Sequence, residues 1–139
     1  MSLNLLFDEN FGKPIVRALA SLLSFHELNP TVKHLLDLAP PGEPDERWIP
    51  RISAEDWIVV TKDKGAHGGS KLPIICRRQR VTHVLLVGRL TERRQFEQVR
   101  AVLVVWPNLI RASDVPRGSR FRLRLAGVHP ILELTPESP

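Results

Sequence analysis

Some residue types are scarce or missing in this chain, and each absence narrows what the protein can be. Of its 139 residues one is cysteine, Cys76, so the chain can form neither an intramolecular disulfide nor a cysteine-based zinc site. Tyrosine is absent, which removes a tyrosine platform for stacking bases. No apolar run approaches the roughly 20 residues of a membrane-spanning helix, and the first residues, MSLNLLFDENFGK, do not resemble a signal peptide. We therefore expect a cytoplasmic protein with no membrane segment.

Charge is distributed unevenly along the chain. Residues 1–69 contain 7 Lys or Arg and 10 Asp or Glu, whereas residues 70–124 contain 13 Lys or Arg and 3 Asp or Glu. The basic second half favours nucleic-acid binding, because Lys and Arg neutralise phosphates whatever the base sequence. A solvated, arginine-rich surface explains the same charge equally well, so both interpretations stay open.

Apolar runs separated by turn residues predict strands that alternate with helices. The expected strands cover residues 4–7, 57–61, 82–87, 108–112, 121–125 and 128–134. The expected helices cover residues 11–25, 46–53, 73–80 and 91–106. Residues 31–38 fit a strand or a helical turn, and 39–44 and 63–70 fit loops. This order predicts one α/β domain of three layers with a mostly parallel central sheet and a C-terminal hairpin, over residues 1–134, with a frayed tail at 135–139.

Capping and stop signals set the expected helix ends. Asp45 is expected to cap the helix over 46–53, and Thr91 the helix over 91–106, with Phe96 on its buried stripe. Pro107 is expected to end that second helix. The three tryptophans lie in apolar contexts, which predicts core positions for Trp48, Trp57 and Trp106.

Acidic residues follow two of the expected strands. Asp8 ends the first and Asp63 follows the strand over 57–61, while Asp45 and Glu46 open the helix between them. The carboxyl ends of parallel strands meet at one edge of a sheet, so these carboxylates are expected to gather there. Hard divalent cations such as Mg²⁺ or Mn²⁺ bind such oxygens and suit phosphodiester hydrolysis. Ordinary turns and helix caps explain the same acids. Glu9 is expected to point elsewhere than Asp8 if the chain is still extended there.

Three segments in order carry a family resemblance: LLFDEN, PDERWI and DWIVVTKDKG. Together they resemble the PIN-like domain family, and within it the small prokaryotic toxin ribonucleases of the VapC type. The resemblance implies a Mg²⁺- or Mn²⁺-dependent ribonuclease, often a toxin held by a cognate antitoxin, and it brings the expectation of a homodimer. Asp8, Asp45 and Asp63 match the metal-binding and catalytic acids. Supporting roles then fall to Asn10, Glu46 and Thr61.

The chain departs from the family pattern at one turn. The usual second Asp and the Phe after it are replaced by Gly65 and Ala66, so a fourth carboxylate is missing there. The remaining acids and water can still hold a metal. The departure equally fits a catalytically weakened protein that binds RNA or another protein, and this alternative stays open.

Basic residues follow the last of these acids. Lys62, Lys64 and Lys71 are candidates for neutralising RNA phosphates, and Arg77 and Arg78 are candidates for a basic helical face. Solvated surface charge explains them equally well. A phosphoryl-accepting receiver domain fits poorly. It needs a Lys at the end of its last central strand, whereas the expected strand over 82–87 is followed by Gly88 and Arg89.

Overall fold

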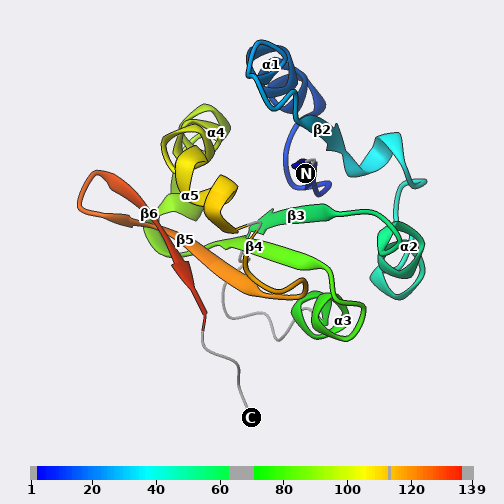
Figure 1. Cartoon of the computed structure of the whole chain (residues 1–139). Helices are drawn as coiled ribbons and strands as arrows, with labels where there is room; N and C mark the ends of the chain where they lie inside the picture. Colours follow the sequence, from blue (N-terminus) through cyan, green and yellow to red (C-terminus); the bar gives the residue numbers. More distant parts are fainter. Residues whose placement is uncertain (1–2, 63–70, 113, 136–139) are drawn as a thin grey trace.

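A six-stranded sheet forms the centre of the computed structural model, which describes residues 3–62, 71–112 and 114–135 (Figure 1). The strand order is β2-β1-β3-β4-β5-β6, and every neighbouring pair is parallel except β5 with β6. The strands are β1 (Asn4–Phe7), β2 (Thr31–His34), β3 (Trp57–Lys62), β4 (Thr82–Leu86), β5 (Arg120–Ala126) and β6 (His129–Leu134). The predicted mostly parallel sheet and closing hairpin are confirmed.

Helices cover both faces of this sheet. Helices α1 (Lys13–Leu23), α4 (Gln95–Val104) and α5 (Trp106–Ala112) share one apolar core with β1, β3, β4 and β5. On the other face, α2 (Asp45–Ile52) and α3 (Leu72–Arg78) form a smaller core with β1 and β3. Figure 1 shows the resulting three layers. Strands buried on both faces explain why NLLF and WIVV are continuous apolar runs rather than alternating patterns.

Residues 31–38, for which a strand and a helical turn were both open, contain both. β2 ends at His34 and a 3₁₀ turn, η1 (Leu35–Asp37), follows at once. The three tryptophans lie in the core as predicted, since Trp48, Trp57 and Trp106 are all buried. Within the described parts of the chain, no helix is long and apolar enough to cross a membrane.

The expected strand over residues 108–112 is wrong, because these residues belong to helix α5. Pro107 does not end a helix but occupies the second position of this one. Proline is tolerated in a first helical turn, where its missing N–H would have no partner in the helix. Backbone N–H groups of Asn108 and Leu109 both donate to the carbonyl of Val105 and start the new helix.

The predicted start of the preceding helix is also wrong. Thr91 lies in the 3₁₀ helix η2 (Gly88–Glu92), and Arg94 is the residue that caps α4, without a side-chain hydrogen bond. The buried Gln98 explains the later start, because its Nε2 donates to the carbonyls of Leu90, Thr91 and Arg93 and so holds the non-helical segment. Phe96 is 70% exposed and lies outside the buried stripe.

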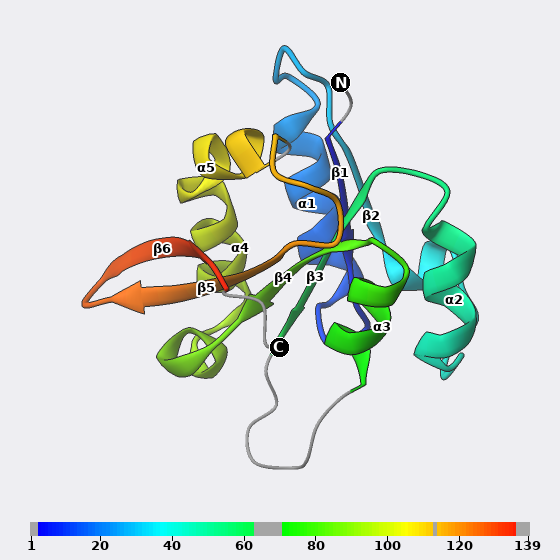
Figure 2. The same cartoon turned by 60° about the horizontal axis from the view of Figure 1, so that its bottom comes forward.

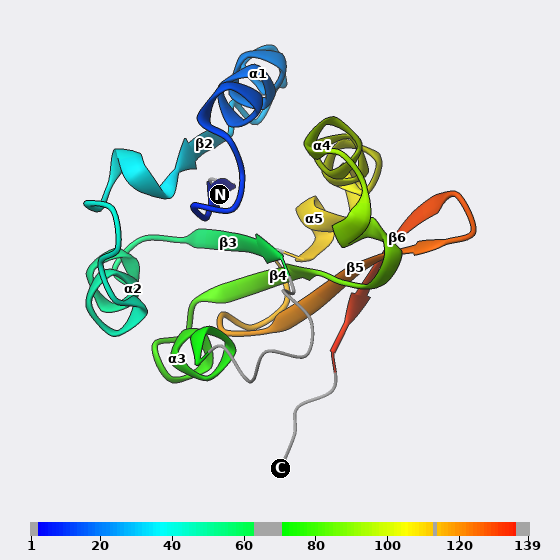
Figure 3. The same ribbon diagram turned by 180° about the vertical axis from the view of Figure 1, so that it is seen from behind.

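The β5–β6 hairpin reaches beyond the helical layer on one face of the sheet. In Figures 2 and 3 it projects past helix α3, which lies beneath β3 and β4. The core on the α3 face contains no residue of β5 or β6, whereas the opposite core contains Phe121 and Leu123. Thr135 was placed in the frayed tail, but its N–H donates to the carbonyl of Arg120 at 2.7 Å and continues the pairing. Residues 136–139 of that tail lie outside the described residues.

Candidate functional site

Asp8 lies where β1 ends at the carboxyl edge of the sheet. Phe7 is in register with Val60 of β3, and the Asp8 N–H donates to the Val60 carbonyl at 3.2 Å. The chain then turns, and Asn10 folds back on Asp8. The Asn10 N–H donates to Oδ1 of Asp8 at 3.1 Å, and Asn10 Nδ2 donates to Oδ2 at 2.8 Å. Asn10 therefore fixes the orientation of a half-buried Asp8 carboxylate.

Lys62, at the end of β3, lies beside this carboxylate. Its Nζ donates to the Asn10 carbonyl at 2.9 Å and lies 4.5 Å from the centre of the Phe11 ring. Burial lowers the pKa of Lys62, and the negative charge of Asp8 acts in the opposite direction. The proposed phosphate-binding lysine is thus held in place by the loop that carries Asp8, with its charge directed at that loop.

Asp45 opens α2 on the α3 side of the sheet. The prediction that it caps this helix is wrong, because Pro44 is the capping residue and Asp45 is the first helical one. Its Oδ1 instead accepts a hydrogen bond from Trp48 Nε1 at 2.9 Å. Burial raises the pKa of Asp45; the Trp48 bond lowers it, and the charges of Glu46 and Glu9 raise it further. Asp45 is therefore a partly buried carboxylate surrounded by like charge.

Glu9 connects the Asp8 loop with the loop before the Asp45 helix, because the chain turns at residues 9–10 and is not extended there. Its Oε1 accepts a hydrogen bond from the Gly42 N–H at 3.3 Å, in the loop that leads into α2. Its charge also contributes to the raised pKa of Asp45. The sequence signal for Glu9 was its position beside Asp8, but its direction depends on the turn at residues 9–10.

The structure brings Asp8, Asn10 and Lys62 together, and it brings Glu9 and Glu46 close enough to Asp45 to affect its pKa. Asp63, Lys64 and the substituted Gly65 and Ala66 lie outside the described residues. Among residues 3–62, 71–112 and 114–135, no three His, Cys, Asp or Glu side chains are grouped so that they could hold a metal ion. Lys71 is exposed just before α3, and Arg77 and Arg78 are exposed at the far end of that helix.

A buried polar pair joins the central strands β3 and β4. Thr61 of β3 and His83 of β4 are both buried, and Thr61 Oγ1 lies 2.7 Å from His83 Nε2. Burial lowers the pKa of His83 to about 3, with a further contribution from the positive charge of Arg120. Thr61 thus uses its hydroxyl within the core, whereas the family resemblance implied a supporting role for it at the metal site. With this low pKa the imidazole is neutral at ordinary pH.

Thr61→Val is expected to lower the free energy of unfolding by about 1–3 kcal/mol, because it leaves a buried His83 nitrogen without its partner. Urea denaturation at pH 7 measures this change. Thr61→Ser keeps the hydroxyl and provides the matched control, with a smaller loss that reflects only the missing methyl group. Equal stabilities for the valine and wild-type proteins would show that the Thr61–His83 bond contributes nothing to folding.

Comparison with known protein families gives a match to the first part of the chain. The sequence model of the PIN like domain matches residues 3–70, which contain β1 to β3 and the acids described above. This part of the chain, just under half of its length, is therefore similar to the PIN-like domain family. No curated protein and no solved structure matches the chain. The resemblance to a PIN-like domain is therefore confirmed at the level of the family. The three-layer α/β arrangement of the chain agrees with the nuclease-type fold of that family.

Proposed function

We propose that the protein is a ribonuclease that hydrolyses RNA phosphodiesters with a Mg²⁺ or Mn²⁺ ion at the carboxyl edge of its sheet. The observation that carries this proposal is the position of Asp8, oriented by Asn10 at the end of β1 in a PIN-like domain. The carboxyl edge of a parallel sheet is where ligands of such folds collect. Asp63 follows β3 in the sequence and is proposed as the next acid at this edge.

The donor chemistry of the edge fits a hard divalent cation. The acids near it offer carboxylate oxygens, which are the ligands that Mg²⁺ and Mn²⁺ prefer. Asp8, Glu9 and Asp45 are not grouped so that these three alone could hold an ion, and the proposed site therefore needs Asp63. The raised pKa of Asp45 reflects burial and two neighbouring negative charges, and a bound cation relieves that repulsion. Asp8, Asp45 and Asp63 are the proposed ligands. When bound, the ion lowers the pKa of water and stabilises charge on the phosphate.

The chain's own residues have separate roles in this proposal. Asn10 holds Asp8 with two hydrogen bonds, so its carboxylate does not rotate when RNA arrives. Lys62 supplies a fixed positive charge beside Asp8, which attracts a phosphate to the edge. The hydrogen bond between Thr61 and His83 joins β3, the strand that leads to Asp63, to its neighbour β4. Glu46, exposed in the first turn of α2, is the proposed supporting acid.

Cleavage of a labelled single-stranded RNA by the purified protein tests this function. We expect cleavage with Mg²⁺ or Mn²⁺ and none with EDTA, and we expect added metal to restore it. Titration calorimetry with Mn²⁺ measures metal binding separately. If no divalent ion supports cleavage and calorimetry detects no binding, the ribonuclease proposal is wrong.

A second candidate is a PIN-like protein that binds RNA or a partner protein without cutting. Two observations favour it. A fourth acid is missing at Gly65, and the carboxylate of Asp8 already interacts with Asn10 and with the positive charge of Lys62 within the protein. RNA binding without metal-dependent cleavage would support this candidate.

The family resemblance also gives the ribonuclease proposal a cellular setting. We propose a cytoplasmic toxin held by a cognate antitoxin, and a homodimer as its assembly. Co-expression with the product of a small neighbouring gene, followed by purification, tests for the antitoxin. Light scattering of the purified protein measures its oligomeric state.

A further inference from the structure

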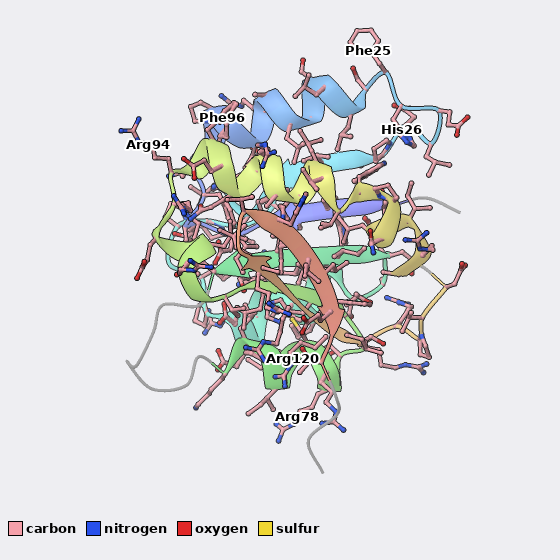
Figure 4. The ribbon with its side chains drawn as sticks, turned by 90° about the vertical axis from the view of Figure 1, so that its left-hand side faces the viewer. Phe25, His26, Arg78, Arg94, Phe96 and Arg120 are labelled. Carbon is pink, nitrogen blue, oxygen red and sulfur yellow. The ribbon has the colours of Figure 1, made fainter. Side chains whose placement is uncertain are left out.

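Four arginines from two distant parts of the sequence lie on the face of the sheet that carries α3. Arg78 and Arg80 come from the end of α3 and the residues after it, and Arg120 and Arg122 come from β5. Gly118 brings the two parts together. A Cβ there would lie 3.1 Å from Arg80 Cα, and its φ of +90° is one that glycine adopts without strain. Figure 4 shows Arg78 and Arg120 on the same side of the molecule.

The strand geometry turns these arginines into a row. Arg120, Arg122 and Arg124 alternate with Phe121 and Leu123, which are buried in the core on the opposite face. Three alternate residues of a strand extend over about 13 Å. Because β5 is parallel to β4, the row begins at the amino edge of the sheet, beside Arg78 and Arg80, and runs toward the carboxyl edge.

Among the described residues, no helix covers this positively charged part of the sheet. The apolar core on the α3 face includes no residue of β5, and on the arginine side of this strand Arg122 is exposed while Arg120 is half-buried. Arg124 is neutralised by Glu133, to which it donates at 2.7 Å. Arg78, Arg80, Arg120 and Arg122 have no ion pair with any described residue. The charge of Arg120 also contributes to the low pKa of His83, its register partner on β4.

We infer that Arg78, Arg80, Arg120 and Arg122, here called the arginine face, bind the phosphate backbone of RNA that extends beyond the cleavage site. This inference rests on the proposed ribonuclease function for the identity of the ligand. The face is separate from the carboxylate edge, since Arg78, Arg80 and Arg120 lie at the opposite ends of the parallel strands. Guanidinium groups in a row, exposed at Arg78, Arg80 and Arg122 and half-buried at Arg120, match a polyanion. Phosphate contacts position a strand without reading its bases.

Fluorescence anisotropy with a labelled single-stranded RNA of 25 nucleotides, in EDTA, tests the arginine face without any cleavage. The quadruple variant R78A/R80A/R120A/R122A is expected to bind at least tenfold more weakly than wild type at about 0.1 M salt. Its plot of log affinity against log salt is expected to be less steep by about 3, since each lost contact with a single strand removes about 0.7.

The matched control is R17A/R94A/R100A/R111A, which removes the same number of charges from exposed positions on the other face of the sheet. Arg17 lies in α1, Arg94 and Arg100 lie at the start of α4 and within it, and Arg111 lies in α5. Arg94 lies on that side in Figure 4. We expect this control to keep an affinity within about threefold of wild type. Equal losses in the two quadruple variants would overturn the inference, because they would reflect net charge alone. So would unchanged binding by the arginine-face variant, which would leave the face to an acidic protein partner.

Circular dichroism and thermal melting establish that both quadruple variants fold. If the arginine-face variant does not, the single charge reversals R78E and R120E replace it, with R94E as their control, and each is expected to weaken binding. The outcome is independent of the ribonuclease test. Wild type that binds RNA through this face but never cuts it contradicts only the proposed function, whereas metal-dependent cutting with no contribution from the face contradicts only the inference.

Discussion

Asp8→Asn is expected to lower the rate of metal-dependent RNA cleavage by about 100-fold or more, which corresponds to about 3 kcal/mol of transition-state stabilisation. The substitution preserves the size of the side chain and removes its negative charge. Asp8 is the acid that the structure orients most firmly, with one Asn10 donor on each carboxylate oxygen. Initial rates of RNA cleavage in Mn²⁺ measure the effect, and thermal melting checks that the variant is folded.

Two further variants separate charge from orientation at this position. Asn10→Ala keeps the Asp8 charge but removes the Nδ2 bond, and we expect a loss of about tenfold, as for other groups that orient metal ligands. Asp114→Asn changes an exposed acid after α5 and should cut RNA as wild type does. If Asp8→Asn cuts as fast as Asp114→Asn, Asp8 is not part of a catalytic site. If Asp8→Asn loses no more of the cleavage rate than Asn10→Ala does, the negative charge of Asp8 contributes nothing beyond the orientation of its side chain.

Local sequence was sufficient to predict the part of the site that lies on the strands. NLLF and WIVV are continuous apolar runs, so their ends, and therefore Asp8 and the position before Asp63, could be placed in advance. The parallel pairing of β1 with β3 followed from the alternation of strands and helices. The PIN-like resemblance over these residues then suggested the chemistry.

The features that escaped prediction depend on contacts between distant residues. Glu9 turns toward Gly42, 33 positions along the chain, and nothing in its neighbours indicates that direction. Lys62 lies against the Asn10 carbonyl because β3 pairs with β1. The helix over 106–112 was mistaken for a strand because Pro107 was interpreted as a stop signal, although proline also fits a first turn. The arginine face needs Gly118 to bring β5 beside the end of α3.

His83 is expected to make the folded protein lose stability as the pH falls below about 6.5. Its pKa is about 3 in the folded chain, against 6.5 for an ordinary histidine, because it is buried and lies near Arg120. The unfolded chain therefore takes up a proton between pH 6.5 and 3 that the folded chain does not. The stabilisation is present above pH 6.5 and falls by about 1.36 kcal/mol per pH unit below it. This single group accounts for about 2 kcal/mol between pH 7 and pH 5.

His83→Gln isolates that contribution, because glutamine places an amide near the position of Nε2, beside Thr61, but does not titrate. Urea denaturation at half-unit steps from pH 7 to pH 5 gives the free energy of unfolding for both proteins. Other titrating groups act equally in the two chains, so the difference between the curves reports on His83. We expect the free energy of unfolding of wild type minus that of the variant to fall by about 2 kcal/mol between pH 7 and pH 5, whatever stability the variant has lost at pH 7.

The matched control is His129→Gln, which changes an exposed histidine at the start of β6. We expect its curve to run parallel to that of wild type over the same range. Parallel curves for His83→Gln as well would mean that His83 takes up its proton equally in the folded and unfolded chains. The imidazole would then have to be hydrated in the folded protein, and β3 and β4 could not pack around Thr61 and His83 as a dry support for the strand that leads to Asp63.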